Sequence, residues 1–122
     1  MKHLPSILTN TIKHKDQNYN TVGDYGENKE FWWVHISKMD KWQYEAMVLI
    51  HELVEMILTK HRRINWDKIT KFDVNNPQLE EPGLNKKAPY HKEHLFATKI
   101  EKSLCCELNL DWNKYDEAVT KL

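Results

Sequence analysis

A histidine and two glutamates interrupt an otherwise apolar stretch of the chain, AMVLIHELVEMIL at residues 46–58. A helix turns by about 100° per residue, so His51, Glu52 and Glu55 would fall within one sector of roughly 100°. His51 and Glu55 are four residues apart and would lie one above the other, as two ligands of one cation must. Glu52 would lie beside them, placed to polarise a water molecule. The pattern therefore predicts a divalent-metal site on a mostly buried helix.

A second stretch, APYHKEHLFATKIEKSLCCEL at residues 88–108, offers partners for this site. As a helix it has an apolar face formed by Phe96, Ala97, Ile100, Leu104 and Leu108. His94 and Glu101 fall on the border of that face and stack along one line, two turns apart. Because a border residue can face a partly buried cleft, the two stretches together predict a metal held by His51, Glu55 and His94. Glu101 is expected either as a fourth ligand or as the acid that orients one.

Ordinary structural roles remain open for the same residues. The first motif is short, and its spacing also occurs in the solvent-facing polar stripes of amphipathic helices. His94 would also suit a half-buried histidine bonded to a backbone carbonyl, and Glu101 a surface acid paired with a nearby lysine. His91 points further outward, and Glu93 suits either a helix-dipole partner or a further ligand. Asp73, just before a long loop, is either a turn residue or an acid bonded to a ligand.

The local texture of the chain predicts the elements that must hold these residues. The segment SILTNTIKH is rich in β-branched residues, Gly23 and Gly26 indicate a turn, and EFWWVHIS at residues 30–37 has strong strand propensity. These segments predict a sheet of two or three strands. From Asp40, the candidate N-cap, helical periodicity predicts a long helix over about residues 41–61.

The rest of the chain is predicted to be helical apart from one long loop. A short helix is expected over residues 66–73, another from Pro89 to about Leu108, and a last one after Asp111 as its cap. The intervening VNNPQLEEPGLNKKAP predicts a loop, which is as consistent with a binding loop as with a surface connection. The predicted fold class is therefore α+β, a small N-terminal β-sheet packed on two long helices plus a short C-terminal helix. We expect residues 1–122 to form a single domain.

Charge and composition narrow the classes of partner. The 18 basic and 18 acidic side chains balance and are interspersed, so the basic footprint of nucleic-acid binding is missing. The first residues lack a signal-peptide pattern, and no apolar run is long enough to span a membrane. Cys105 and Cys106 are adjacent, which suits small buried thiols better than a disulfide. We therefore expect a cytoplasmic protein with neither a nucleic-acid nor a membrane partner.

The sequence HELVE resembles the HExxH signature of zincin metallopeptidases, in which two histidines bind zinc and the first glutamate activates the attacking water. Here Glu55 replaces the second histidine, giving HExxE, and a carboxylate can also ligate zinc. The order of strand, motif helix and acid-bearing helix is similar to the minimal gluzincin core. The chain also resembles small, uncharacterised bacteriophage-encoded proteins with an HELxE helix, a PYxxEHxxAxxIE helix and a DWxxY segment, here residues 51–55, 89–101 and 111–115.

The resemblance implies a zincin-like, metal-dependent hydrolase of phage origin, located in the host cytoplasm. Zinc is the expected divalent metal, Glu52 the expected general base, and a peptide or host protein the expected substrate. One alternative is a non-enzymatic phage protein that binds a host protein or a small ligand and uses a metal only structurally. Another is an HD-domain phosphohydrolase, because LIHELVE is similar to an HDxxE motif. HD domains are all helical, so this alternative requires the segment around His35 to be a helix.

Overall fold

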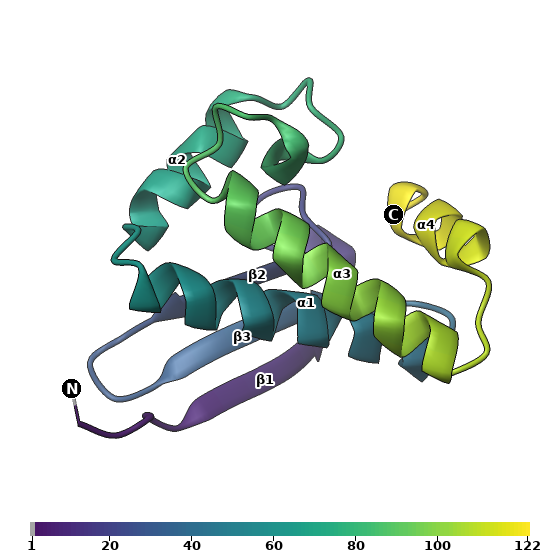
Figure 1. Cartoon of the computed structure of the whole chain (residues 1–122), viewed down its shortest axis with the longest axis horizontal. Helices are drawn as coiled ribbons and strands as arrows, with labels where there is room; N and C mark the ends of the chain where they lie inside the picture. Colours follow the sequence, from purple (N-terminus) through teal and green to yellow (C-terminus); the bar gives the residue numbers. More distant parts are fainter. Residues whose placement is uncertain (1) are drawn as a thin grey trace.

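The structure, a computed structural model, describes residues 2–122 and combines a small N-terminal sheet with four α-helices (Figure 1). Its elements in chain order are β1 (Ile7–Ile12), the 3-10 helix η1 (His14–Asp16), β2 (Gly23–Glu27), β3 (Trp32–Ser37), α1 (Trp42–His61), α2 (Trp66–Asn75), the 3-10 helix η2 (Pro82–Leu84), α3 (His91–Glu107) and α4 (Trp112–Thr120). α1 packs against both β2 and β3 and also against α3. The predicted α+β fold is confirmed.

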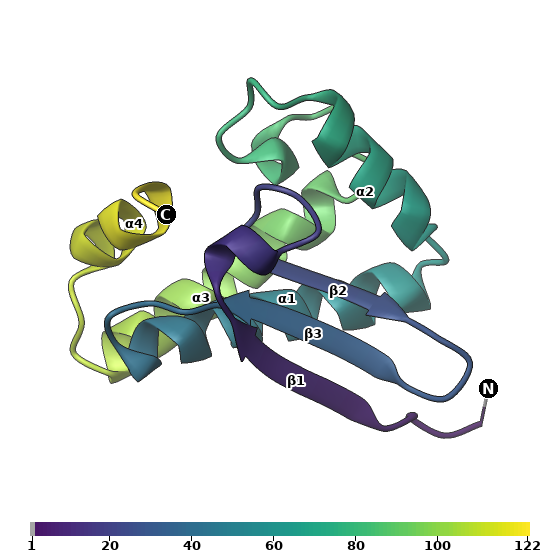
Figure 2. The same cartoon turned by 180° about the vertical axis from the view of Figure 1, so that it is seen from behind.

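The sheet places β3 at its centre, parallel to β1 and antiparallel to β2. Alternation along β3 buries Trp32, Val34 and Ile36 in the core, as expected for a half-buried strand. Trp33 and His35 lie on the opposite face, where their rings stack 4.5 Å apart. Figure 2 shows this face of the sheet from outside, with η1 crossing one end. The segment around His35 is a strand and not the helix expected for an HD domain, which favours the zincin-like alternative.

The two glycines that predicted a turn, Gly23 and Gly26, lie instead within β2. Each is needed for a close approach, since a Cβ on Gly26 would lie 2.3 Å from the Trp33 ring and one on Gly23 would lie 2.6 Å from the Glu52 side chain. The turn of this hairpin comes later. There the Asn28 side chain accepts hydrogen bonds from the backbone amides of Glu30 and Phe31.

α1 buries one continuous stripe of side chains at intervals of three and four residues. The stripe consists of Tyr44, Met47, Val48, His51, Glu52, Glu55, Met56 and Thr59. The prediction of Asp40 as its N-cap is wrong, because Lys41 occupies that position and makes no side-chain cap hydrogen bond. Glu45 instead ties the preceding segment to the first turn of α1 by accepting a 2.8 Å hydrogen bond from the amide of Met39.

α3 is rotated relative to the prediction from its apolar pattern. Its buried side chains are Glu93, His94, Ala97, Glu101 and Cys105, whereas Phe96 is 47% exposed. The reason is that the surface of α3 facing α1 is largely polar, so apolarity does not mark burial there. Ala97 is fully buried, and its small side chain allows α3 to approach its neighbours closely. His94 and Glu101 therefore lie within the buried stripe rather than at its border.

The remaining helices begin where the sequence indicates. Asp111 caps α4 by accepting hydrogen bonds from the amides of Asn113 and Lys114, as predicted. α2 starts after Asn65, which caps it in the same manner, and continues two residues beyond the predicted end. Both cysteines are free, although Cys106 is exposed rather than buried. Within residues 2–122, no helix combines the length and the apolarity needed to cross a membrane.

Candidate metal centre

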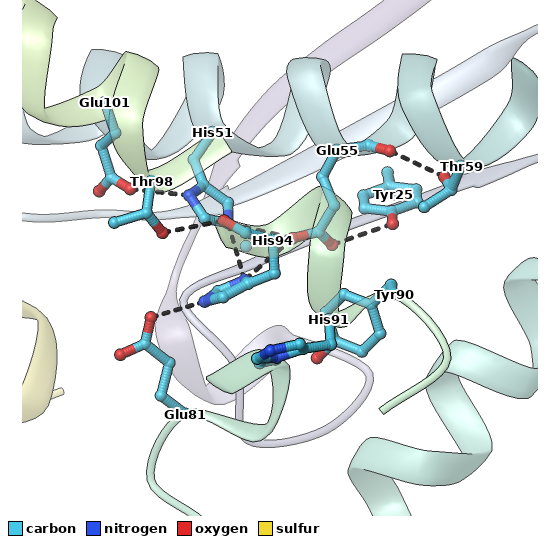
Figure 3. A network of polar contacts seen from close by, with 12 residues as sticks. Tyr25, His51, Glu55, Thr59, Glu81, Tyr90, His91, His94, Thr98 and Glu101 are labelled. Carbon is cyan, nitrogen blue, oxygen red and sulfur yellow. Dashed lines mark hydrogen bonds and ion pairs between the residues drawn. The ribbon is translucent and has the colours of Figure 1, made fainter. Parts of the chain in front are cut away.

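Three side chains from α1 and α3 meet at one point, and we call them the metal triangle: His51, Glu55 and His94 (Figure 3). His51 Nε2 and Glu55 Oε2 are 3.1 Å apart, and His94 Nδ1 is also 3.1 Å from each of these two atoms. The four-residue spacing on α1 brings the first pair together, and the packing of α3 against α1 adds the third atom. One atom from each side chain thus faces a common centre.

All three members of the metal triangle are buried. His51, Glu55 and His94 expose only 8%, 4% and 7% of their surfaces. The alternative of a solvent-facing polar stripe on α1 is therefore wrong. So is that of a carbonyl-bonded His94, because both of its ring nitrogens contact carboxylates. Polar groups buried to this extent need partners, and each finds them within the cluster.

Each member of the metal triangle is also oriented by a second partner. His51 Nδ1 lies 2.7 Å from Glu101 Oε1, and His94 Nε2 lies 2.7 Å from Glu81 Oε1. Glu55 Oε1 accepts a 2.9 Å hydrogen bond from the hydroxyl of Tyr25. Such carboxylate–histidine pairs fix the ring orientation of metal-binding histidines and raise their basicity.

Glu101 belongs to this outer layer of partners. One of its oxygens bonds to His51 and the other accepts a hydrogen bond from the hydroxyl of Tyr115 on α4. Glu101 therefore lies outside the metal triangle, contacts His51 through the ring nitrogen that faces away from it, and does not pair with a surface lysine. Tyr115 itself is 3% exposed, so α4 closes this side of the site.

The electrostatics of the metal triangle reflect its burial and its mutual contacts. Burial alone would lower the pKa of His51, but hydrogen bonds to Glu101 and Glu55 raise it to about 11. Burial likewise opposes charge on His94, yet Glu55 and Glu81 raise its pKa to about 9. Burial would raise the pKa of Glu55, but the two histidines lower it to about 2. The cluster is therefore built to hold positive charge next to Glu55, as either protons or a cation.

The donor set and its spacing fit a transition-metal ion. Two imidazoles and one carboxylate form a common catalytic zinc ligand set. Zinc bonds of about 2.0–2.1 Å at tetrahedral angles hold ligand atoms about 3.4 Å apart, so a shift of about 0.2 Å per ligand would suffice. The lone pairs of His51 Nε2 and His94 Nδ1 can both face the centre, because the other ring nitrogens bond to carboxylates. Among residues 2–122, this is the one group of three or more His, Cys, Asp and Glu side chains whose ligand atoms all lie within 4.8 Å of one another.

Glu52 lies next to the metal triangle but takes no part in its contacts. It is 8% exposed, and no donor within residues 2–122 forms a hydrogen bond with its carboxylate. Burial, followed by the charge of Glu55, raises its pKa well above the usual value. Its side chain fits against the backbone of β2 only because residue 23 is a glycine. Glu52 thus offers a carboxylate with free acceptor sites beside a candidate metal centre.

A cavity of about 830 Å³ opens over this cluster. Its lining includes the metal triangle, Glu52, the start of β2, α2, α4 and the loop between α2 and α3. Glu81, on that loop, contacts the His94 side chain. The loop also packs closely on the His94 ring, since a Cβ on Gly83 would lie 2.3 Å from it. The long loop of the sequence is therefore part of the site and not a surface excursion.

Other candidate residues lie outside the metal triangle. Glu93 pairs with Arg62 at 2.6 Å, and His91 contacts the backbone carbonyl of Gly83. Asp73 does not bond to a member of the metal triangle, but it lines the cavity and accepts hydrogen bonds from two tyrosines. The sequence reasoning missed Tyr25, Glu81, Tyr115 and Gly23. An isolated glycine in a strand was the one available signal among them.

Three comparisons with known proteins found no similar protein. No family model matches the chain, and neither the curated proteins nor the solved structures contain a match.

Proposed function

We propose that this protein is a metal-dependent hydrolase of zincin-like type. The observation that carries the proposal is the pairing of a complete, oriented metal triangle with an unpartnered carboxylate at its side. A bound divalent metal, with zinc as the expected ion, would supply Lewis acidity to a scissile carbonyl and to an attacking water. The cavity gives a substrate access to the same point. This arrangement has the parts that hydrolysis requires.

Each residue then has a defined task. His51, Glu55 and His94 bind the metal, and Glu101, Glu81 and Tyr25 hold them in orientation. Glu52 accepts the proton of the attacking water on its carboxylate and passes it to the leaving group. Its raised pKa makes the Glu52 carboxylate a stronger proton acceptor than an ordinary glutamate. The metal triangle would supply three protein ligands, the number that catalytic zinc sites use.

The finer parts of the proposal rest on the resemblance to zincins and to small phage proteins. The HExxE spacing on α1 and the metal-facing histidine on α3 support a zincin-like assignment in which histidine and glutamate have exchanged helices. On the same resemblance we propose a peptide or host protein as the substrate, a phage origin, and the host cytoplasm as the location.

The test combines metal content with turnover. Protein purified without added metal should contain about one equivalent of zinc or another transition metal per chain. The zinc-loaded protein should cleave some members of a mixed peptide library, which mass spectrometry would detect. Glu52→Gln should keep the metal and lose about 10²-fold or more of this activity, because it removes the proton acceptor.

The outcomes separate an enzyme from a structural metal site. The matched control is Glu107→Gln, which changes an exposed glutamate on α3 and should leave both metal and turnover unchanged. Equal cleavage by wild type and Glu52→Gln would remove Glu52 from the mechanism. One bound metal with no cleavage of any peptide would favour the non-enzymatic alternative, and no metal under any loading condition would exclude both.

A further inference from the structure

Three buried or half-buried acids on one side of the cavity lack a cationic partner. We call Asp24, Glu52 and Asp73 the acidic side; they come from β2, α1 and α2 and all line the same cavity. None of the ion pairs formed within residues 2–122 includes any of them. Carboxylates withdrawn from water are costly unless a positive charge or several donors compensate them.

The contacts that these acids do make are weak or neutral. Asp24 is 8% exposed, accepts a hydrogen bond from the amide of Tyr25 and has one further donor, the Asn18 amide at 3.5 Å. Asp73 accepts hydrogen bonds from the hydroxyls of Tyr19 and Tyr90. Glu52 has no donor among residues 2–122 and is more than nine-tenths buried while lining the cavity.

In the described part of the chain, no basic side chain that lines the cavity pairs with the acidic side. Apart from the two histidines of the metal triangle, the basic side chains lining the cavity are His14 and Lys102. His14 is bonded to Ser37 and Asn20, and Lys102 lies over the ring of Trp112 at 5.1 Å. Neither of these basic side chains pairs with an acid of the acidic side.

The three acids of the acidic side do not come together as three ligands of one metal ion. Within residues 2–122, the ligand atoms of only one group, the metal triangle, come within 4.8 Å of one another. An ammonium or guanidinium group can bridge acids that are further apart, because it reaches each through its own hydrogen bond of about 2.8 Å. Tyr19 and Tyr90, whose hydroxyls bond to Asp73, also line this part of the cavity.

We infer that the cavity takes a peptide through a lysine or arginine side chain, which docks between Asp24 and Asp73 next to the metal triangle. This inference rests on the proposed function for the peptide nature of the ligand. Glu52 adds a third acid to this side, since its side chain packs against Gly23, the residue before Asp24, and lines the same cavity. Asp24 and Asp73 would therefore determine which residue lies beside the scissile bond.

The test measures binding rather than cleavage, on metal-free protein so that no turnover can interfere. The probes are three fluorescein-labelled peptides of equal length with capped ends, which differ at one position: lysine, arginine or norleucine. Fluorescence anisotropy of the wild type should show about tenfold or tighter binding of the lysine and arginine peptides than of the norleucine peptide. Equal binding of the three peptides by the wild type would overturn the inference without any variant.

Variants then locate the docking site. Asp24→Asn combined with Asp73→Asn should reduce the preference for lysine and arginine to less than about threefold. Asp116→Asn, which removes an exposed acid of α4 at the same cavity, should retain it. Circular dichroism checks that the double variant is folded. A preference that persists in the folded double variant would overturn the inference.

Two further results separate this inference from its rivals. A second equivalent of zinc or calcium that binds the wild type and is lost in the double variant would overturn it, since a metal would then neutralise the acids. Zinc-dependent cleavage with no preference for basic residues would also overturn it and leave the hydrolase intact. A clear preference for basic peptides with no cleavage would support the docking site while removing the hydrolase.

Discussion

The metal triangle and the acidic side line the same cavity, but their buried charged groups differ in the partners they have. In the metal triangle, every carboxylate and imidazole contacts an oppositely charged group or a hydroxyl, and Glu101, Glu81 and Tyr25 complete the set. On the acidic side, Asp24, Glu52 and Asp73 receive amides and hydroxyls or nothing at all. Both sides are held on regular elements of the same small fold, so the difference does not come from flexibility.

The difference shows that the metal triangle has all its partners within the protein, whereas the acidic side does not. The metal triangle is preorganised, because its ligand atoms already surround a common centre and their second partners hold them there. The acidic side remains short of positive charge and would be completed by what enters the cavity. The predictions below test this contrast by removing partners from one side and charge from the other.

The largest effect is expected from the double variant His51→Ala with His94→Ala. It removes two of the three ligands, so the metal content should fall from about one equivalent per chain to about zero. Inductively coupled plasma mass spectrometry of the purified protein measures this directly. His61→Ala removes an exposed histidine at the end of α1 and should keep the metal. Unchanged metal content in the double variant would place the metal elsewhere.

A smaller loss is expected from Glu101→Gln. The variant can keep a hydrogen bond to His51, but it loses the negative charge that makes the imidazole more basic. Metal affinity should fall about 10–100-fold, as measured by competition with a chelator of known affinity. The exposed Glu107 on the same helix provides the control, as Glu107→Gln. An unchanged affinity in Glu101→Gln would mean that the orientation of His51 is secured by packing alone.

The acidic side should respond in the opposite direction, with a gain in stability. Burial raises the pKa of Asp24 to about 6, so the folded protein binds its proton more tightly than the unfolded chain does. The cost of burying this carboxylate is absent below about pH 4, grows as the pH rises, and is fully present above about pH 6. Asp24→Asn should therefore raise the free energy of unfolding by about 3 kcal/mol at pH 7 and by nearly nothing at pH 4.

Urea denaturation of the metal-free protein at these two pH values measures this gain. Asp116→Asn should show no comparable difference, because its side chain is exposed to solvent. A loss of stability at pH 7 in Asp24→Asn would show that the carboxylate already has a compensating partner.

The smallest effect is expected from Glu81→Gln. Its side chain is 48% exposed, in contrast to that of Glu101, so water already weakens its interaction with His94. Metal affinity should fall only about two- to fivefold by the same chelator competition. A loss of metal affinity as large as that of Glu101→Gln would show that Glu81 orients His94 as firmly as Glu101 orients His51.

The parts of the site that could be predicted from the sequence lie on two regular helices. His51, Glu52 and Glu55 follow from the 3.6-residue period of α1, and His94 and Glu101 from that of α3. The fold class followed from the same change of period near residue 40. Periodicity relates residues within one helix, so it identifies candidate ligands without showing what lies opposite them.

The partners that cross between elements could not be found in this way. Tyr25, Glu81 and Tyr115 reach the site from a strand, a loop and another helix, and their positions depend on how the chain packs. The exposure of Phe96 also depends on packing between elements. The face of α3 that is buried carries polar side chains, whereas the sequence pattern predicted burial of the apolar face with Phe96. Gly23 was assigned to a turn because the need for space next to Glu52 is not visible in the local sequence.

The contact between Tyr115 and Glu101 has a consequence for the time at which the site forms during synthesis. The metal triangle and its orienting partners are drawn from positions between Tyr25 and Tyr115, which is most of the length of the chain. Since chains emerge from the ribosome at about 5–20 residues per second, His51 and Glu55 emerge seconds before Tyr115 does. The nascent protein therefore completes the set of contacts around the metal triangle only after α4 has emerged and docked.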